Sequence, residues 1–220
     1  MLENFNVLNQ KTVGAVISNH CLLDGPQGNL EAIINIPKNS KTFAHYAVIC
    51  HPHPLHEGSM SNKIVHTIAK TLTKNNIPSV QFNFRGVGKS EGEFDNAIGE
   101  QQDLIAVEKA IHSLFPQQSL YLAGFSFGAY VALHTQATLN AEKLILVAPP
   151  IRTLNFSDPP YPTCPCLLIQ GLDDDVIDSS ATINWAENSN ADITISKHKN
   201  VGHFFHGHLV ELSRTIESFI

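Results

Sequence analysis

The stretch Leu120–Gly128, LYLAGFSFG, constrains the fold more than any other part of the chain. An apolar run typical of a buried strand ends in a Gly-x-Ser-x-Gly motif, and a helical pattern follows at once. In this context the motif predicts a sharp strand-to-helix turn that holds Ser126 in a strained backbone conformation. Gly124 and Gly128 have no Cβ, so neighbouring backbone can approach on either side. A serine held out in this way indicates a nucleophile, which needs a base and an orienting acid.

Short β-rich runs alternate with helical patterns from about residue 44 to the end of the sequence. This alternation predicts an α/β fold with a mostly parallel sheet and helices on both faces, in one domain spanning residues 1–220. The predicted strands are residues 30–36, 46–50, 79–84, 120–123, 144–148, 167–170 and 193–196, and the predicted helices lie around residues 64–72, 104–114, 129–139, 178–185 and 205–219.

The composition limits the classes of partner. A net charge of −6 argues against nucleic acid, because such partners usually need a basic face. No segment approaches the ~18 apolar residues of a membrane span, and the first residues lack the basic start and apolar core of a signal peptide. The four cysteines, Cys21, Cys50, Cys164 and Cys166, fit neither a disulfide framework nor a zinc site. We therefore expect a cytoplasmic protein with reduced thiols, no metal and no membrane partner.

Two loops that follow predicted strands contain the partners that Ser126 would need. Residues 171–177, GLDDDVI, follow one apolar strand, and residues 200–205, NVGHFF, follow the next. Because the carboxyl ends of parallel strands meet at one edge of a sheet, we expect both loops to lie near Ser126.

Five motifs occur in a fixed order along the chain. They are His-Pro-His-Pro at 51–54, Arg-Gly-x-Gly-x-Ser at 85–90, the Gly-x-Ser-x-Gly turn, the aspartate-rich loop and Gly-His-Phe-Phe at 202–205. With them the chain resembles the α/β-hydrolase superfamily over roughly residues 28–220, and most of all small lidless bacterial serine hydrolases akin to dienelactone hydrolase. Many relatives insert a helical lid where this chain has only residues 149–164, so we expect no large lid.

The resemblance implies that Ser126 is the nucleophile, His203 the general base and Asp174 the acid that orients the base. The family places its acid three residues after a glycine and two before a branched apolar residue, and Asp174 fits both spacings. Asp175 stays open as the alternative acid, and Asp173 is expected to be a solvated loop charge.

The resemblance also implies two backbone N–H donors for the oxyanion of a tetrahedral intermediate. One is expected at Phe127, directly after the nucleophile, and the other in the His-Pro-His-Pro loop. Pro52 and Pro54 have no N–H, so His53 is the expected second donor and Leu55 the alternative.

Arg85 and the Gly-Lys-Ser sequence at 88–90 invite ligand-binding interpretations. A phosphate-binding loop needs a glycine at position 83, where this chain has Asn83, so nucleotide binding is a minor alternative. Arg85 could bind a substrate carboxylate. We favour a structural ion pair with a nearby acid instead, and the candidates are Glu91, Glu93 and Asp95.

The function implied by this set of residues is hydrolysis of a small carboxylic ester through an acyl-enzyme, with no cofactor. The same residues would serve a thioesterase or a small amide or peptide hydrolase. A non-catalytic binding protein of the same fold is an alternative from another class. Candidate pocket walls are Phe125, Phe127, Ile151, Leu154, Phe156, Tyr161 and Phe204.

Overall fold

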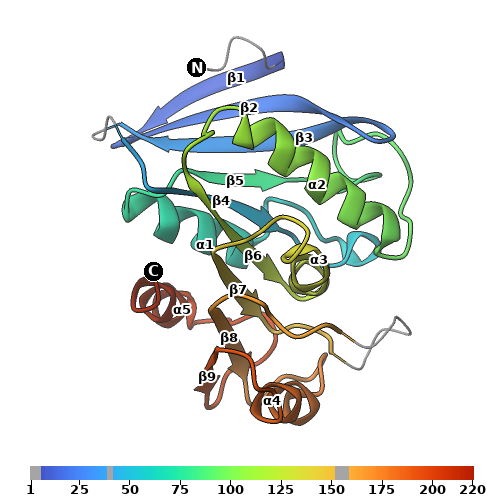
Figure 1. The fold of residues 1–220 in the computed structure, drawn as a ribbon, viewed down its shortest axis with the longest axis vertical. Helices are drawn as coiled ribbons and strands as arrows, with labels where there is room; N and C mark the ends of the chain where they lie inside the picture. The colour runs from blue at the N-terminus through green and yellow to red at the C-terminus, as the bar shows by residue number, and fades with distance from the viewer. Residues whose placement is uncertain (1–5, 39–41, 152–158) are drawn as a thin grey trace.

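The structure is a computed structural model that describes residues 6–38, 42–151 and 159–220 (Figure 1). The strands are β1 (Asn6–Val13), β2 (Val16–Gly25), β3 (Gly28–Pro37), β4 (His45–Cys50), β5 (Ser79–Phe82), β6 (Ser119–Phe125), β7 (Lys143–Val147), β8 (Cys166–Gly171) and β9 (Ile193–His198). The helices are α1 (Lys63–Lys74), α2 (Ile98–His112), α3 (Phe127–Thr135), α4 (Ser179–Glu187) and α5 (Leu209–Glu217), with a short 3₁₀ turn η1 (Pro54–His56).

All these strands form one sheet in the order β1-β2-β3-β5-β4-β6-β7-β8-β9. From β5 to β9 neighbouring strands run parallel, whereas β1, β2, β3 and β5 are paired antiparallel. The mostly parallel sheet and the seven predicted strands are therefore confirmed. The strands β1 and β2 were not predicted. The strand β1 is exposed along its whole length and has no alternating apolar pattern.

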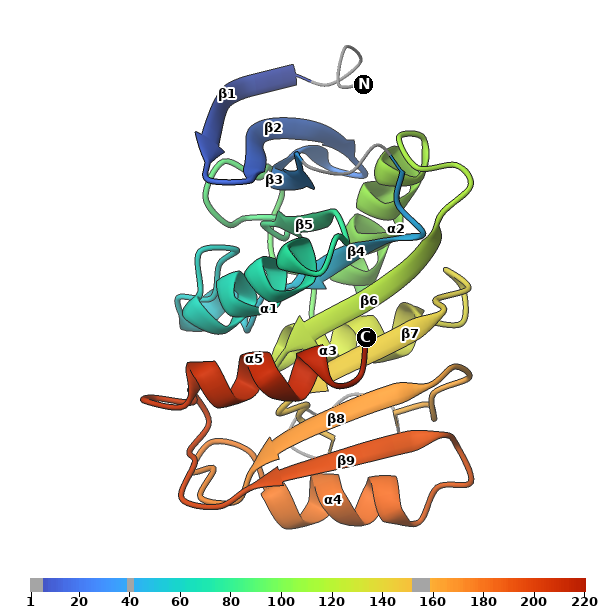
Figure 2. The same ribbon diagram turned by 90° about the vertical axis from the view of Figure 1, so that its left-hand side faces the viewer.

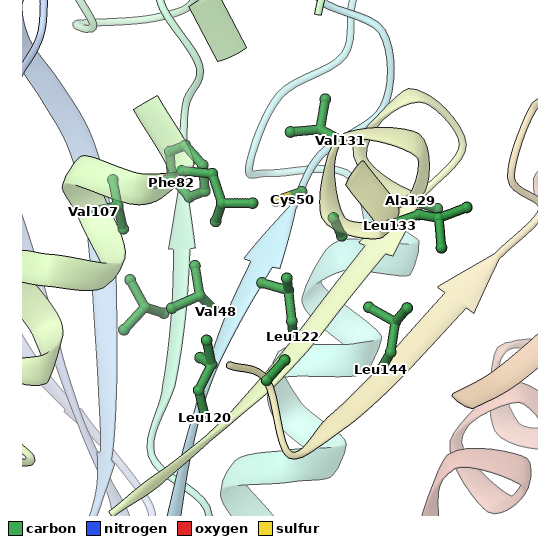
Figure 3. Packing of buried hydrophobic residues seen from close by; sticks show 14 of the residues in the cluster. Val48, Cys50, Phe82, Val107, Leu120, Leu122, Ala129, Val131, Leu133 and Leu144 are labelled. Carbon is green, nitrogen blue, oxygen red and sulfur yellow. The ribbon is translucent and has the colours of Figure 1, made fainter. Parts of the chain in front are cut away.

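Helices cover both faces of the sheet, as the alternation of strand and helix patterns predicted. In Figures 1 and 2, α1 and α5 lie on one face, and α2, α3 and α4 lie on the other. Each face has its own buried apolar cluster, since alternate strand residues point to opposite sides. Figure 3 shows the cluster under α2 and α3, where Val48, Leu122 and Leu144 of the sheet meet Val107 and Val131 of the helices.

Side-chain caps define where two of the helices begin. Asn62 accepts a hydrogen bond from the Ile64 amide at the start of α1, at 2.9 Å. Asp178 accepts one from the Ala181 amide at the start of α4, also at 2.9 Å. The helix after the Gly-x-Ser-x-Gly turn ends earlier than predicted, at Thr135 rather than residue 139.

Candidate active site

Ser126 occupies the sharp turn between β6 and α3. Its backbone has φ 52° and ψ −121°, a conformation that non-glycine residues rarely adopt, so the predicted strain is present. A Cβ at Gly124 would lie 2.3 Å from the carbonyl oxygen of Gly128. A Cβ at Gly128 would lie 2.4 Å from the carbonyl oxygen of Cys50 at the end of β4. The two glycines therefore allow the helix to start against the sheet.

The structure brings Ser126, His203 and Asp174 together. His203 Nε2 lies 3.1 Å from Ser126 Oγ, and His203 Nδ1 lies 2.8 Å from Asp174 Oδ2. The histidine and aspartate side chains are 3% and 0% exposed, and the serine is 8% exposed. These groups come from the loops after β9, β8 and β6, which end at the same edge of the sheet.

Asp174 is held by four hydrogen bonds. Its Oδ1 accepts from the backbone amides of Val176 (3.0 Å) and Ile177 (2.8 Å), and its Oδ2 accepts from His203 and from Gln170 Nε2 (3.0 Å). Burial alone would raise the pKa of Asp174, but the bonds from His203, Ile177 and Val176 outweigh it and lower that pKa. The carboxylate therefore stays ionised beside the imidazole.

The neighbouring aspartates have different surroundings. Asp173 and Asp175 are exposed, and neither contacts His203 in the hydrogen bonds of the described residues. Asp173 fits the predicted solvated loop charge. For Asp175, the alternative acid, this geometry is unfavourable.

The acid loop and the histidine loop are bonded to each other through their backbones. The amide of Leu172 donates to the carbonyl of His198 at 2.8 Å, and the amide of Asp173 donates to that of Val201 at 3.1 Å. A Cβ at Gly171 would lie 2.3 Å from the Val201 oxygen, so only glycine fits this contact. Sequence patterns did not reveal this pairing, which sets the distance between Asp174 and His203.

The expected oxyanion donors lie on two sides of the serine turn. Phe127 is the first residue of α3, and the first amides of a helix have no partner within it. His53 directly precedes η1, and its ring centroid lies 4.9 Å from that of Phe127. The amide of Leu55, the alternative donor, already donates to His53 Nδ1 at 3.2 Å. The geometry thus favours His53 over Leu55.

His51, which sequence analysis left without a role, fixes the loop that contains His53. It is fully buried, with Nδ1 2.6 Å from the Pro52 carbonyl and Nε2 accepting the Phe84 amide at 3.0 Å. Since a carbonyl only accepts and an amide only donates, the ring is neutral with its proton on Nδ1. Burial lowers the pKa of His51 to about 4.

Arg85 has a structural role, but its main partner differs from the predicted ones. The guanidinium is 1% exposed and forms a two-point ion pair with Asp103 of α2, with Nη2 to Oδ1 at 2.7 Å. It also donates to the Gly99 carbonyl, and Asp95 is a more distant partner at 3.9 Å. The prediction named acids near in sequence, whereas the folded chain brings α2 over this loop. Arg85 is therefore not free to bind a substrate carboxylate.

The Gly-Lys-Ser sequence forms a turn against β3 rather than a phosphate cradle. The amide of Lys89, which such a cradle would direct at phosphate, donates to Glu31 Oε2 at 2.9 Å. Ser90 Oγ donates to the carbonyl of Asn83 and accepts from the Glu31 amide. A carboxylate already occupies the position of the anion, which argues against nucleotide binding here.

The candidate pocket walls have mixed positions. Phe125, Phe127 and Ile151 are buried, and the Phe125 ring lies against His203 at 4.9 Å. Phe204 is 47% exposed and lies edge-on to His203 at 5.0 Å, so one of the rings beside His203 is in contact with solvent. Tyr161 stacks on Trp185 instead. The other two candidates, Leu154 and Phe156, lie outside the described residues.

All four cysteines are free thiols, and burial raises the pKa of Cys21 to about 12 and that of Cys164 to about 11. Over the described ranges, no three His, Cys, Asp or Glu residues are grouped so that they could hold a metal ion. Within the same ranges, no helix has the length and apolar character needed to cross a membrane.

Known proteins resemble this chain in fold and in sequence. The family model described as "Serine aminopeptidase, S33" matches residues 45–163. A lidless α/β serine hydrolase of Xanthomonas campestris is 38% identical, with a TM-score of 0.86, and the match covers 96% of this chain and 95% of that one. An uncharacterized protein of Rickettsia prowazekii is 32% identical over 208 residues, 90% of this chain and 86% of the relative.

A more distant structure supports the fold alone. Est1E from Butyrivibrio proteoclasticus, with ferulic acid bound, is 18% identical, with a TM-score of 0.79 over 90% of this chain and 96% of that one. Together, fold and relatives define the class: a serine hydrolase of the α/β-hydrolase fold, whose Xanthomonas relative is lidless. The chain belongs to the serine aminopeptidase S33 family.

Proposed function

We propose that this protein is an esterase that cleaves a small carboxylic ester through an acyl-enzyme formed on Ser126. The proposal rests above all on the hydrogen-bonded series from Ser126 Oγ through His203 to Asp174. In this series each group has the partner that its role requires, and the aspartate is ionised. A serine hydroxyl is a weak nucleophile alone, so this arrangement is what makes attack on a carbonyl feasible.

In the first half of the reaction, His203 Nε2 takes the proton of Ser126 Oγ while that oxygen bonds to the ester carbonyl carbon. Asp174 accepts the Nδ1 proton in a hydrogen bond and stabilises the imidazolium, without taking the proton itself. The tetrahedral intermediate carries its negative charge on the former carbonyl oxygen. We propose that the amides of Phe127 and His53 donate to that oxygen, since each such donor is worth about 100–1,000-fold in rate.

The intermediate collapses when the bond to the leaving alcohol breaks and His203 returns its proton to the alcohol oxygen. Water then attacks the acyl-enzyme, His203 takes one of its protons, and the acid leaves as Ser126 regains its hydrogen. No metal or redox group takes part in these steps.

Amide hydrolysis is a second candidate, because the matching family model is described as a serine aminopeptidase. Ester and amide differ in leaving group, and the proposed residues would act on both in the same order. A thioester would also react in this way. A pair of matched substrates, a short-chain nitrophenyl ester and an aminoacyl nitroanilide, distinguishes ester from amide preference by kcat/KM.

We make two further proposals, one about domain organisation and one about cellular location. Residues 1–220 form one domain, since all strands of the described residues hydrogen-bond into one sheet. The protein is cytoplasmic, in keeping with its four free thiols. We also keep the narrower likeness to dienelactone-hydrolase-like enzymes as a prediction.

The decisive experiment replaces the nucleophile. Ser126→Ala should lose turnover of a short-chain nitrophenyl ester by several powers of ten and should no longer be labelled by a fluorophosphonate. Its melting temperature should be unchanged or slightly raised, because the variant loses only a hydroxyl at a strained position. Ser113→Ala, at the exposed end of α2, is the control. A Ser126→Ala variant with undiminished turnover would remove the nucleophile from the proposal.

A further inference from the structure

Gln170, the next-to-last residue of β8, contacts the proposed acid of the site and belongs to no sequence motif. Its side chain is 0% exposed. Nε2 donates to Asp174 Oδ2 at 3.0 Å and to the Gly171 carbonyl at 3.1 Å. Asp174 Oδ2 is the oxygen that also binds His203 Nδ1. One carboxylate oxygen thus accepts from both the imidazole and the buried amide.

The orientation of this amide is fixed by its surroundings. If its oxygen and nitrogen were exchanged, Oε1 would face two acceptors, the Gly171 carbonyl and the Asp174 carboxylate. In the orientation present, Oε1 is buried and accepts no hydrogen bond from the described residues. A buried acceptor without a donor weakens a fold, so the amide is not explained by stability alone.

We propose that Gln170 is a positioning residue that holds the Asp174 carboxylate and tunes its charge for His203. This inference rests on the proposed role of His203 and Asp174 as base and acid. The amide keeps Oδ2 in line with His203 Nδ1, and the two Asp174 Oδ1 bonds prevent rotation of the carboxylate. By donating to Oδ2, Gln170 also withdraws negative charge from the oxygen that stabilises the imidazolium.

The withdrawal of charge from Asp174 Oδ2 predicts the direction in which the pH profile shifts. The base must be neutral to accept the serine proton, so the acid limb of the pH profile of kcat/KM reports its protonation. Gln170 makes Oδ2 a weaker partner for the imidazolium, which favours the neutral ring at lower pH. Without the amide, the imidazolium is stabilised more strongly, and the acid limb moves to higher pH. A purely structural glutamine would not shift this limb.

The test is Gln170→Met, which keeps the size of the side chain and removes both its donor and its unpartnered oxygen. We expect the plateau of kcat/KM for a short-chain nitrophenyl ester to fall about tenfold, since Asp174 loses a charge-assisted hydrogen bond. The acid limb should move to higher pH, and the melting temperature should stay the same or rise.

Gln136→Met is the matched control. Gln136 is also buried, but its amide oxygen accepts from Thr163, which precedes β8, whereas Asp174 follows that strand. This variant should be less stable and should keep the wild-type pH profile. Gln170→Glu adds a second carboxyl group beside Asp174, and above the pH at which that group ionises it should lose activity through repulsion.

The outcomes separate the two proposals. If Gln170→Met keeps the wild-type rate and pH profile while Ser126→Ala is inactive, the inference about Gln170 is wrong and the proposed function stands. If Gln170→Met is merely unstable, with an unshifted acid limb, its role is structural and the inference also fails. If Ser126→Ala retains turnover, the proposed function itself fails.

Discussion

At the residue scale, close backbone contacts explain why the turn at Ser126 needs its glycines. The carbonyl oxygens of Cys50 and His51 both lie within 2.5 Å of where a Gly128 Cβ would stand. Neither carbonyl can move without shifting the end of β4, which leads directly into the loop of the proposed donor His53. The turn of the proposed nucleophile and the strand that leads to the proposed donor His53 are thus in direct contact, because residue 128 has no Cβ.

Gly128→Ala should therefore damage both stability and turnover. Overpacking of this kind costs about 1–3 kcal/mol of unfolding free energy, and a displaced donor should lower kcat by roughly 100-fold. Urea unfolding and steady-state kinetics measure the two effects. Gly14→Ala is the control, because Gly14 has φ +58° and open space around it. That variant should lose about 1 kcal/mol and no activity.

Individual residues also show what sequence could and could not predict. Ser126, Asp174 and His203 belong to motifs with fixed spacing, and the structure brings them within hydrogen-bond distance. Asp103 and Gln170 belong to no motif. Their importance arises from contacts between distant elements, and an isolated aspartate or glutamine in a sequence gives no sign of such contacts.

At the scale of elements, the loop with His203 is tied at both ends to one carboxylate. Glu211 of α5 lies 2.8 Å from His198 Nδ1, at the end of β9, and 3.1 Å from His208 Nδ1, just before α5. Between these ends Phe205 is fully buried with φ 51° and lies against His198. The loop is therefore fixed by a buried ring in the middle and by the two histidine–carboxylate hydrogen bonds at its base.

Glu211→Gln should loosen this loop and lower kcat/KM about threefold to tenfold, with little loss of stability, because partly exposed pairs contribute roughly 0–1 kcal/mol. The matched control is Glu187→Gln, which breaks the exposed pair with Lys197 on the same strand, at 2.6 Å, without touching the loop. The rate of fluorophosphonate labelling gives a second measurement that is independent of substrate. Equal rates in the two variants would contradict this role for Glu211.

Elements were predicted best where burial gave a strong pattern. The central strands are covered on both faces, and their continuous apolar runs were recognised. The strand β1 has all eight residues exposed, so neither face carries an apolar signal. The end of α3 was misplaced because the apolar and small residues of a fully buried helix continue past Thr135 without a helix-stopping residue.

At the scale of the whole molecule, acid should destabilise the fold through its buried titratable groups. His51 has a pKa of about 4 in the folded protein and an ordinary pKa of 6.5 when solvated, so the unfolded chain binds more protons between these values. Its contribution to stability is therefore complete above about pH 6.5 and is lost as the pH falls towards 4. The loss is of order 3 kcal/mol. The pKa of Asp174 is lowered too, so its contribution to stability falls only at a pH below the ordinary aspartate pKa of 3.8.

Urea unfolding at pH 7 and pH 4.5 measures this effect. His51→Gln should reduce the difference in unfolding free energy between pH 7 and pH 4.5. His66→Gln, on the exposed side of α1, should leave that difference unchanged. An equal pH dependence in wild type and His51→Gln would show that His51 is not the group responsible.

The exposed strand β1 has a further consequence for how copies of this protein meet. Since β2 is its one neighbour in the sheet over the described ranges, the outer margin of β1 presents unpaired amides and carbonyls beside the half-exposed Val7 and Leu8. Such a margin is a template for another extended chain. In concentrated solution, self-association should begin at this margin, on the side of the sheet far from β9, and leave the chemistry untouched.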